Sequence, residues 1–160
     1  MLEIDDNHPL LVFGGPYSNL RATSALAGLA RRAGIPPSHV ICTGDVVAYC
    51  AEPEETATLV RTWGIHVIAG NCEESLAADA DDCGCNFEEG TACERLSKGW
   101  YPFADARVSA VSRAWMKALP ATLAFRYAGR RFHVVHGSIA ETARWVFASE
   151  ADRVAAEWRT

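Results

Sequence analysis

Three polar side chains in this sequence each stand just after a short apolar run: Asp45, Asn71 and His136. The runs have the length and composition of buried β-strands, and Gly44 and Gly70 end the first two. In open α/β sheets, ligands bind at the edge where the carboxyl ends of the strands meet. A carboxylate, an amide oxygen and an imidazole at that edge can hold a metal ion, or face a phosphate through one. A single Asp or His after a strand is more often a turn residue. The prediction of a ligand site therefore depends on the repetition of this pattern at three strand ends.

Strands and helices alternate along the chain, and this alternation would position those residues. The first half of the pattern predicts a strand at 9–13, a helix capped at Ser18 or Asn19 and ended by Gly34, and strands at 40–41 and 66–68 separated by a helix from Pro53 to Gly64. The second half predicts helices at 91–100 and 108–119, a hairpin of 122–127 and 131–135, and a helix at 150–158. Strands joined by a helix form a right-handed crossover with parallel pairing. We therefore expect an α/β fold, a mixed β-sheet sandwich flanked by helices, in one domain over residues 1–160.

The buried face of each predicted helix follows from apolar residues spaced by threes and fours. These residues are Leu20, Leu26, Leu29 and Ala30 in the first helix, Leu59, Val60 and Trp63 in the second, and Val108, Val111, Trp115 and Leu119 in the helix before Pro120. We expect them to face the protein core.

Composition and charge limit the classes of partner. The 160 residues are 49% hydrophobic, which is enough for a core and argues against disorder. A formal net charge of -5 argues against binding to nucleic-acid duplexes, which depends on clustered Lys and Arg. Residues 1–8 do not resemble a secretory signal, and no apolar run has the length of a membrane span. We therefore predict a cytoplasmic protein that acts on a small molecule, and we leave homo-oligomerisation open.

Six cysteines are many for this length, and three of them fall in a segment of acidic and small residues at about 73–100. We expect this cysteine-rich segment to cross the ligand-binding edge of the sheet. In a reducing compartment an even number of cysteines does not imply disulfides. Cys83, Cys85 and Cys93 could form a thiolate site for zinc or iron, with Cys72 as a fourth ligand. Buried small side chains are the alternative interpretation.

The residues around the three candidate ligands match short motifs of a known family. The matching motifs are Gly44-Asp45, Gly70-Asn71 and Val135-His136-Gly137. With these motifs the chain resembles the calcineurin-like metallophosphoesterases, in particular a small bacterial branch that cleaves simple phosphodiesters or phosphomonoesters. The resemblance runs from residue 10 to about residue 147. It implies that Asp45 bridges two metal ions, that Asn71 and His136 are metal ligands, and that a water between the metals attacks phosphorus.

The chain departs from the family pattern at three places. Gly15 and Tyr17 stand where the family has the Asp and His of its first metal motif, so the first metal would lose two ligands. Cys72 replaces the His that assists the leaving oxygen in the family. The family's closing Gly-His-x-His has no counterpart. We therefore expect a domain that is incomplete at its C-terminus, either as a shortened chain or as a family member that has lost this segment.

Together these features predict a metal-dependent phosphoesterase with altered metal occupancy that acts on a small phosphate ester. Asp45, Asn71 and His136 would hold a divalent ion such as Mn, Fe, Ni or Zn. Tyr17 could donate a hydrogen bond to a phosphate oxygen, and Cys72 could be a soft ligand, a nucleophile or a buried small residue. The alternative is a noncatalytic metal-binding or regulatory module that kept the fold and lost the chemistry.

Overall fold

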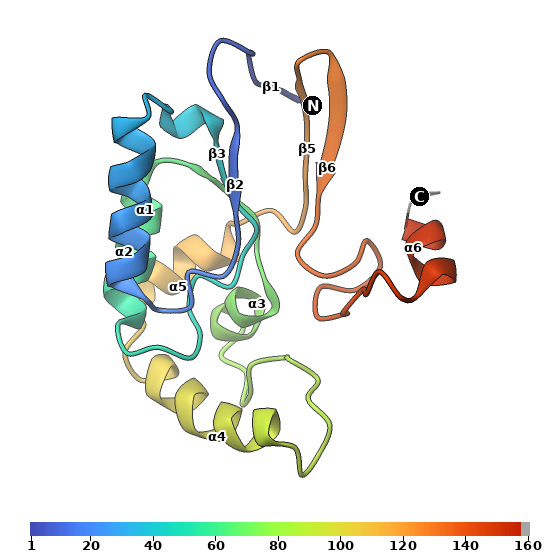
Figure 1. Ribbon diagram of the computed structural model, residues 1–160. Helices are drawn as coiled ribbons and strands as arrows, with labels where there is room; N and C mark the ends of the chain where they lie inside the picture. The colour runs from blue at the N-terminus through green and yellow to red at the C-terminus, as the bar shows by residue number, and fades with distance from the viewer. Residues whose placement is uncertain (158–160) are drawn as a thin grey trace.

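Two three-stranded sheets form the framework of the chain, whose computed structural model describes residues 1–157 (Figure 1). In one sheet, parallel strands lie in the order β2 (Leu11–Phe13), β3 (Val40–Cys42) and β4 (His66–Val67). In the other, β5 (Leu123–Tyr127) pairs in parallel with β1 (Leu2–Glu3) and antiparallel with β6 (Arg130–Val134). The predicted α/β class with mixed strand pairing is confirmed, although β1 was not predicted.

Most of the helices lie on one side of the sheet that contains β2, β3 and β4 or beyond its carboxyl end, and the last described helix lies apart (Figure 1). The described helices are α1 (Leu20–Arg32), α2 (Pro53–Trp63), α3 (Asn71–Ala77), α4 (Ala92–Asp105), α5 (Ala110–Lys117) and α6 (Ala151–Glu157), with a short 3-10 turn at Pro37–His39. Figure 1 shows α1 and α2 side by side, while α6 lies far from them, beyond the hairpin of β5 and β6. The predicted end of the last helix at Trp158 lies outside the described residues. Among residues 1–157, no helix combines the length and apolar character that crossing a membrane requires.

Local sequence signals explain where the first two helices begin and end. The side chain of Asn19 caps α1 by accepting a hydrogen bond from the backbone N–H of Ala22 at 3.0 Å. Pro53 opens α2, where its missing N–H costs nothing. Gly64 ends α2 at φ +74°, a left-handed conformation that favours glycine. Both helices therefore follow the prediction closely.

Two of the predicted buried helix positions are wrong. Leu29 is 55% exposed and Val111 is 59% exposed. The buried residue beside Leu29 in α1 is Ala30, and Ser112 and Met116 are the buried residues of α5. Neighbouring helix positions lie about 100° apart around the axis, so a shift of one position moves a side chain from the core to water.

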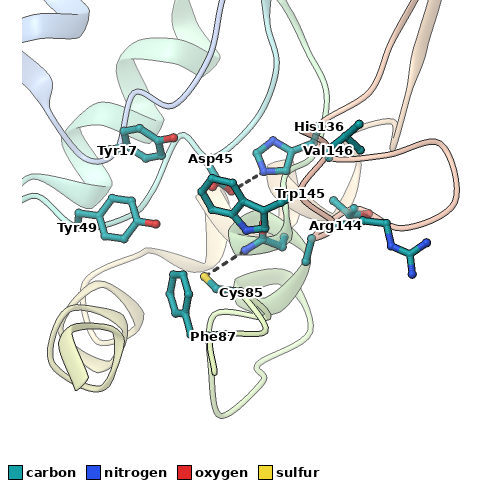
Figure 2. Close-up of a pocket in the computed structure, with 13 residues that line it drawn as sticks. Tyr17, Asp45, Tyr49, Cys85, Phe87, His136, Arg144, Trp145 and Val146 are labelled. Atoms are coloured by element: carbon teal, nitrogen blue, oxygen red, sulfur yellow. Dashed lines mark hydrogen bonds and ion pairs between the residues drawn. The ribbon is translucent and has the colours of Figure 1, made fainter. Parts of the chain in front are cut away.

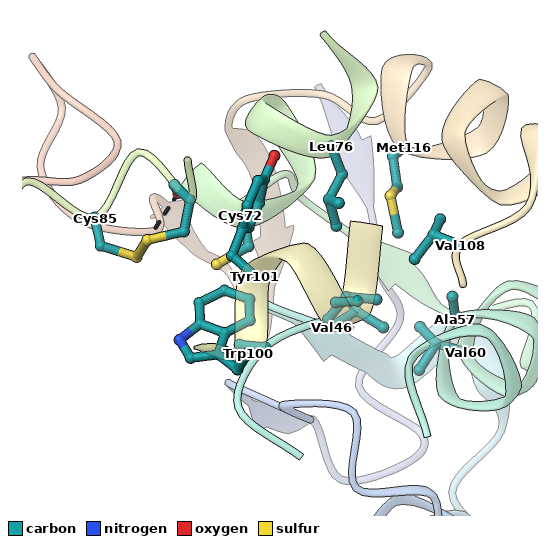
Figure 3. Close-up of a cluster of buried hydrophobic side chains, with 14 of the residues drawn as sticks. Val46, Ala57, Val60, Cys72, Leu76, Cys85, Trp100, Tyr101, Val108 and Met116 are labelled. Atoms are coloured by element: carbon teal, nitrogen blue, oxygen red, sulfur yellow. Dashed lines mark hydrogen bonds between the residues drawn. A yellow bond between two sulfur atoms is a disulfide. The ribbon is translucent and has the colours of Figure 1, made fainter. Parts of the chain in front are cut away.

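The segment at 73–100 contains more helix than its composition predicted. Helix α3 begins at Asn71, directly after the turn that follows β4, and α4 continues past the predicted end at Trp100 to Asp105. Figure 3 shows Trp100 and Tyr101 of α4 in the same buried cluster as Leu76 of α3. Helix α3 packs against α5, and side chains of α3 and α4 share one buried cluster with Cys42 and Val67 of β3 and β4.

Candidate functional site

The three predicted ligands line one cavity of about 290 Å³ (Figure 2). His136 Nε2 lies 3.4 Å from Asp45 Oδ1, and Asn71 lines the same cavity. Asp45 and Asn71 follow β3 and β4 of the parallel sheet, as predicted from their spacing. The expectation that all three lie at one edge of a single sheet is wrong for His136, because it follows β6, the antiparallel edge strand of the other sheet. The site therefore joins the ends of two sheets.

The turn that carries Asp45 is tight and packs directly against the turn after β4. Gly44 has φ +96° and Asp45 has φ +52°, so two successive residues adopt left-handed backbone conformations. A Cβ atom on Gly70 would overlap the Asp45 carboxylate and would also lie 2.9 Å from Cε1 of His136. The absence of a side chain at Gly70 is therefore what lets Asp45 and His136 approach each other.

A fully buried carboxylate, Glu73, holds this turn in place. Its oxygens accept hydrogen bonds from the backbone N–H groups of Asp45 (2.7 Å), Val46 (2.9 Å), Val47 (3.2 Å) and Gly70 (2.9 Å). Burial and the nearby Asp45 charge raise the pKa of Glu73 to about 7, while the backbone donors act in the opposite direction. Glu73 thus connects the turns after β3 and β4.

Sequence analysis missed Glu73 because it assigned this residue to the cysteine-rich segment. A usable signal was present: Glu73 is the third residue of α3, after Gly70 at the N-cap position. A Glu at this position commonly returns to the N-cap backbone N–H, and the contact from Gly70 to Glu73 is of this kind.

His136 is held with one ring nitrogen directed toward Asp45. Its Nδ1 lies 2.7 Å from the carbonyl oxygen of Thr43, and because a carbonyl only accepts, Nδ1 carries the proton. The other nitrogen, Nε2, faces Asp45. Burial lowers the pKa of His136, but the Asp45 carboxylate and the Thr43 hydrogen bond outweigh burial and raise it to about 9. Without a cation at the site, Asp45 and His136 thus form an ion pair at neutral pH.

Asn71 is anchored through its amide nitrogen. Nδ2 donates to the carbonyl oxygen of Cys83 at 2.9 Å and to Sγ of Cys85 at 3.3 Å. These bonds turn the amide oxygen away from the cysteines, and Asn71 is itself 8% exposed in the cavity lining. The oxygen is therefore the end of the Asn71 side chain that is available to a ligand.

The donor types in this cavity are those that a divalent cation uses. Asp45 offers a carboxylate oxygen, His136 offers Nε2 and Asn71 offers an amide oxygen. A carbonyl that accepts from the second ring nitrogen, as Thr43 does here, is the usual support of a metal-bound histidine.

A second cation of the family's kind does not fit. Gly15 has no side chain to offer, and a Cβ atom built on it would overlap the ring of Tyr17. The Tyr17 ring therefore fills the space next to Gly15, where the family's first motif would place metal ligands. Within residues 1–157, no group of three or more His, Cys, Asp or Glu side chains is arranged to hold a metal ion.

The two candidate catalytic residues differ in accessibility. Tyr17 lines the cavity and is 39% exposed, and burial together with Asp45 raises its pKa, so its hydroxyl keeps its proton. Cys72 is completely buried in the core cluster, and its pKa is raised strongly by burial, by Asp45 and by Glu73. The geometry suits Tyr17 as a hydrogen-bond donor to a ligand, whereas the position of Cys72 favours the interpretation as a buried small residue.

Among the predicted thiolate ligands, Cys72, Cys83 and Cys85 share one buried cluster, but two of these three are joined to each other and Cys93 lies apart. Cys83 and Cys85 form a disulfide with their Cα atoms 5.3 Å apart, a separation that a disulfide spans readily. Cys93 is exposed on α4, and Cys72 is buried in the core. The expectation of free thiols at Cys83 and Cys85 is corrected, because the turn between them places both sulfurs on the same side.

A comparison with protein families supports the resemblance. The sequence model of the calcineurin-like phosphoesterase superfamily domain matches residues 4–157. The chain belongs to this superfamily. Its members generally use divalent metal ions, in agreement with the donor set found here. Among curated proteins, no sequence matches the chain.

Solved structures confirm the fold. A metallophosphoesterase from Sphaerobacter thermophilus has a TM-score of 0.66 at 20% identity, over 96% of this chain and 56% of that protein. A hypothetical protein from Pyrococcus horikoshii OT3 has a TM-score of 0.71 at 18% identity, over 94% of this chain and 64% of that protein. The chain thus spans less than two thirds of each of these two proteins.

Proposed function

We propose that the chain hydrolyses a small phosphate ester with the help of one divalent cation held by Asp45, Asn71 and His136. The observation that supports this proposal is the meeting of these three donors, from the ends of two sheets, in one cavity. Membership of the calcineurin-like phosphoesterase superfamily supports the reaction class. Mn, Fe, Ni and Zn are the candidate ions, since imidazole and carboxylate donors suit all four.

The protein residues have separate roles in this proposal. A cation at the site supplies Lewis acidity toward the phosphoryl oxygens. Asp45 and His136 hold it from opposite sheets, and Glu73 fixes the backbone of Asp45. The protonated hydroxyl of Tyr17 donates a hydrogen bond to a phosphate oxygen as the substrate enters.

The test compares wild-type protein with Asp45→Ala in the longest form that its gene encodes. We expect hydrolysis of p-nitrophenyl phosphate or bis(p-nitrophenyl) phosphate with Mn²⁺, Ni²⁺ or Zn²⁺, and a loss of about 100-fold or more in kcat/KM in Asp45→Ala. Elemental analysis should show metal in the wild type and little in the variant. The exposed Asp81→Ala is a matched control that keeps both properties. Turnover that is equal in wild type and Asp45→Ala would rule out this metal centre.

A noncatalytic metal-binding or regulatory module is the second candidate. It is favoured by Gly15 and Tyr17, which remove the ligands of one metal. Protein that hydrolyses neither ester, whether or not it binds metal, would support this candidate over the first.

The proposal also covers the size of the substrate, the place of the reaction and the organisation of the chain. The substrate is a small molecule, without a role for nucleic-acid duplexes or membranes, and the reaction takes place in the cytoplasm. Organisation as one domain over residues 1–160 and the oligomeric state are predictions that size-exclusion chromatography and limited proteolysis can test.

A further inference from the structure

One wall of the cavity consists of aromatic side chains. Tyr17, Tyr49, Phe87 and Trp145 line it, and they come from the turn after β2, the turn after β3, the segment between α3 and α4, and the segment after β6. Figure 2 shows the rings of Tyr17 and Tyr49 next to each other, with their hydroxyl groups directed into the cavity. Four separate segments of the chain thus supply rings to the same space as Asp45.

These rings are exposed to an unusual degree. Tyr17 is 39% exposed, Tyr49 is 47% exposed and Trp145 is 62% exposed. Large apolar side chains that gather in an exposed concave surface usually mark a place where a ligand binds. The cavity of about 290 Å³ has the volume of roughly ten water molecules in the liquid, which is more space than a phosphate group fills.

Both tyrosines adopt a strained backbone conformation. Tyr17 has φ +53° and Tyr49 has φ +41°, in a region that bulky side chains rarely occupy. Tyr17 is kept there by a hydrogen bond from its N–H to the carbonyl of Asp45 at 3.1 Å, and the ring of Tyr49 is held by the Trp100 ring at 5.1 Å. Such strain concentrates at ligand sites, where it aims a side chain. Here it aims two rings into the cavity.

We propose that the substrate carries a planar aromatic ring beside its phosphate ester, and that this ring stacks on Tyr49 and Trp145. The inference rests on the proposed function, because the phosphate is then the group that reaches Asp45, Asn71 and His136. A small planar ring matches the size of the cavity and the mixture of ring walls and polar floor. A nucleobase and a phenol ring share this chemistry, so both sources are tested.

The test measures binding of three phosphonates to the full chain by calorimetry in the presence of Mn²⁺. Phenylphosphonate, cyclohexylphosphonate and methylphosphonate differ only in the group beside phosphorus, and ester hydrolysis does not cleave their P–C bond. We expect phenylphosphonate to bind about 5- to 150-fold more tightly than the other two, the range for stacking of a ring on an aromatic side chain. A second pair, adenosine 5′-monophosphate and ribose 5-phosphate, tests the nucleobase. The base preference is the affinity for adenosine 5′-monophosphate divided by that for ribose 5-phosphate. If it exceeds the preference for phenylphosphonate over methylphosphonate, the ring is a nucleobase.

Variants locate the preference in the cavity wall. Tyr49→Ala and Trp145→Ala should each remove most of the preference for the phenyl group, and Tyr49→Phe should retain it. Phe103→Ala is the matched control: Phe103 is a partly exposed ring on α4, outside the cavity lining, and its loss should leave the preference unchanged.

Two outcomes would overturn the inference. One is equal binding of the phenyl, cyclohexyl and methyl compounds, and the other is a phenyl preference that survives both Tyr49→Ala and Trp145→Ala. If the protein then hydrolyses aryl and alkyl esters at equal rates, the proposed function is supported and the aromatic-ring site is rejected. A phenyl preference in protein that hydrolyses nothing would support the ring site and reject the proposed function.

Discussion

The two sides of the cavity are built in different ways. On one side, the turns after β3 and β4 bury Asp45, Asn71 and Glu73, which are 7%, 8% and 0% exposed. On the other, the open segment 137–149 is held by local hydrogen bonds, such as Ser138 N–H to the Glu141 carbonyl at 3.1 Å, and by bonds from Ile139 N–H to Glu157 and from Thr142 Oγ1 to Glu74. It leaves Trp145 62% exposed. The first side has its polar groups fixed by the protein interior, and the second faces water.

Under the two proposals above, the cation ligands Asp45 and Asn71 lie on the buried side, and Trp145, one of the two proposed stacking residues, lies on the open side. Groups that hold a cation must keep their positions to within a fraction of an ångström, so they are best placed in a buried, hydrogen-bonded turn. Groups that select a substrate must admit it, so they can lie on an open segment. Stability should accordingly be sensitive to substitutions on the buried side and tolerant of substitutions that touch the open side.

The largest expected effect follows from Glu73→Ala. Four backbone N–H groups would lose their buried acceptor, and we expect the free energy of unfolding to fall by about 4 kcal/mol, measured by chemical denaturation. Glu74→Ala is the matched control, because Glu74 is exposed and, among residues 1–157, its carboxylate accepts a single hydrogen bond, from Thr142 Oγ1 of the open segment. Its cost should stay below about 1 kcal/mol. Equal costs for the two variants would contradict the contrast between the two sides.

A smaller effect is expected for Gly70→Ala. The added Cβ would overlap the Asp45 carboxylate, so the two turns must move apart, at a cost of about 1–3 kcal/mol in stability. Metal affinity, measured by calorimetry, should also fall, because Asp45 and His136 would separate. Gly28→Ala in the middle of α1 should instead be neutral or stabilising, because alanine favours helix and the nearest atom is the end of the flexible Arg32 side chain. Unchanged metal affinity in Gly70→Ala would show that the site tolerates displacement of its turn.

The smallest effect is expected for Glu54, whose hydrogen bonds join α2 to α5 away from the cavity lining. Glu54 of α2 accepts hydrogen bonds from Ser109 N–H (2.9 Å), Ser109 Oγ (2.9 Å) and Ser112 Oγ (3.0 Å) at the start of α5. Burial raises the pKa of Glu54, but these bonds and one from Thr58 outweigh it, so the pKa lies below its ordinary value of 4.5.

This stabilisation is present above pH 4.5 and is lost as the pH falls through the lowered pKa. Glu54→Gln should therefore cost about 1 kcal/mol at pH 7, and this cost should shrink as the pH falls below 4.5 and through the lowered pKa, as measured by urea denaturation over a series of pH values. A cost that does not change with pH would show that the charge of Glu54 is not involved.

The sequence allowed the fold, and the strand-end positions of Asp45 and Asn71, to be predicted where a local signal was sufficient. The turn glycines at Gly44 and Gly70 mark the strand ends that carry Asp45 and Asn71, and Pro53 and Gly64 delimit α2. These features depend on neighbours in the sequence. Organisation as one domain over residues 1–160 stays a prediction.

What could not be predicted depends on contacts distant in sequence. The hydrogen bonds that Glu73 accepts from Asp45, Val46 and Val47 join residues up to 28 positions apart, and no local sequence pattern predicts them. His136 follows β6, and β6 belongs to a second sheet because its neighbour β5 pairs with β1. Nothing in the sequences of β1 and β5 predicts that these two distant strands pair, so the sheet of His136 was assigned incorrectly. The positions of Leu29 and Val111 were wrong because an apolar stripe does not fix the rotation of a helix to within one residue.

The ring of Tyr17 beside Gly15 also constrains how this protein can change over evolutionary time. A Cβ atom at Gly15 would overlap the ring of Tyr17, so a side chain can be gained at Gly15 only if that ring moves or is replaced. Sterics therefore couple the two positions, and a substitution at one changes what the other tolerates.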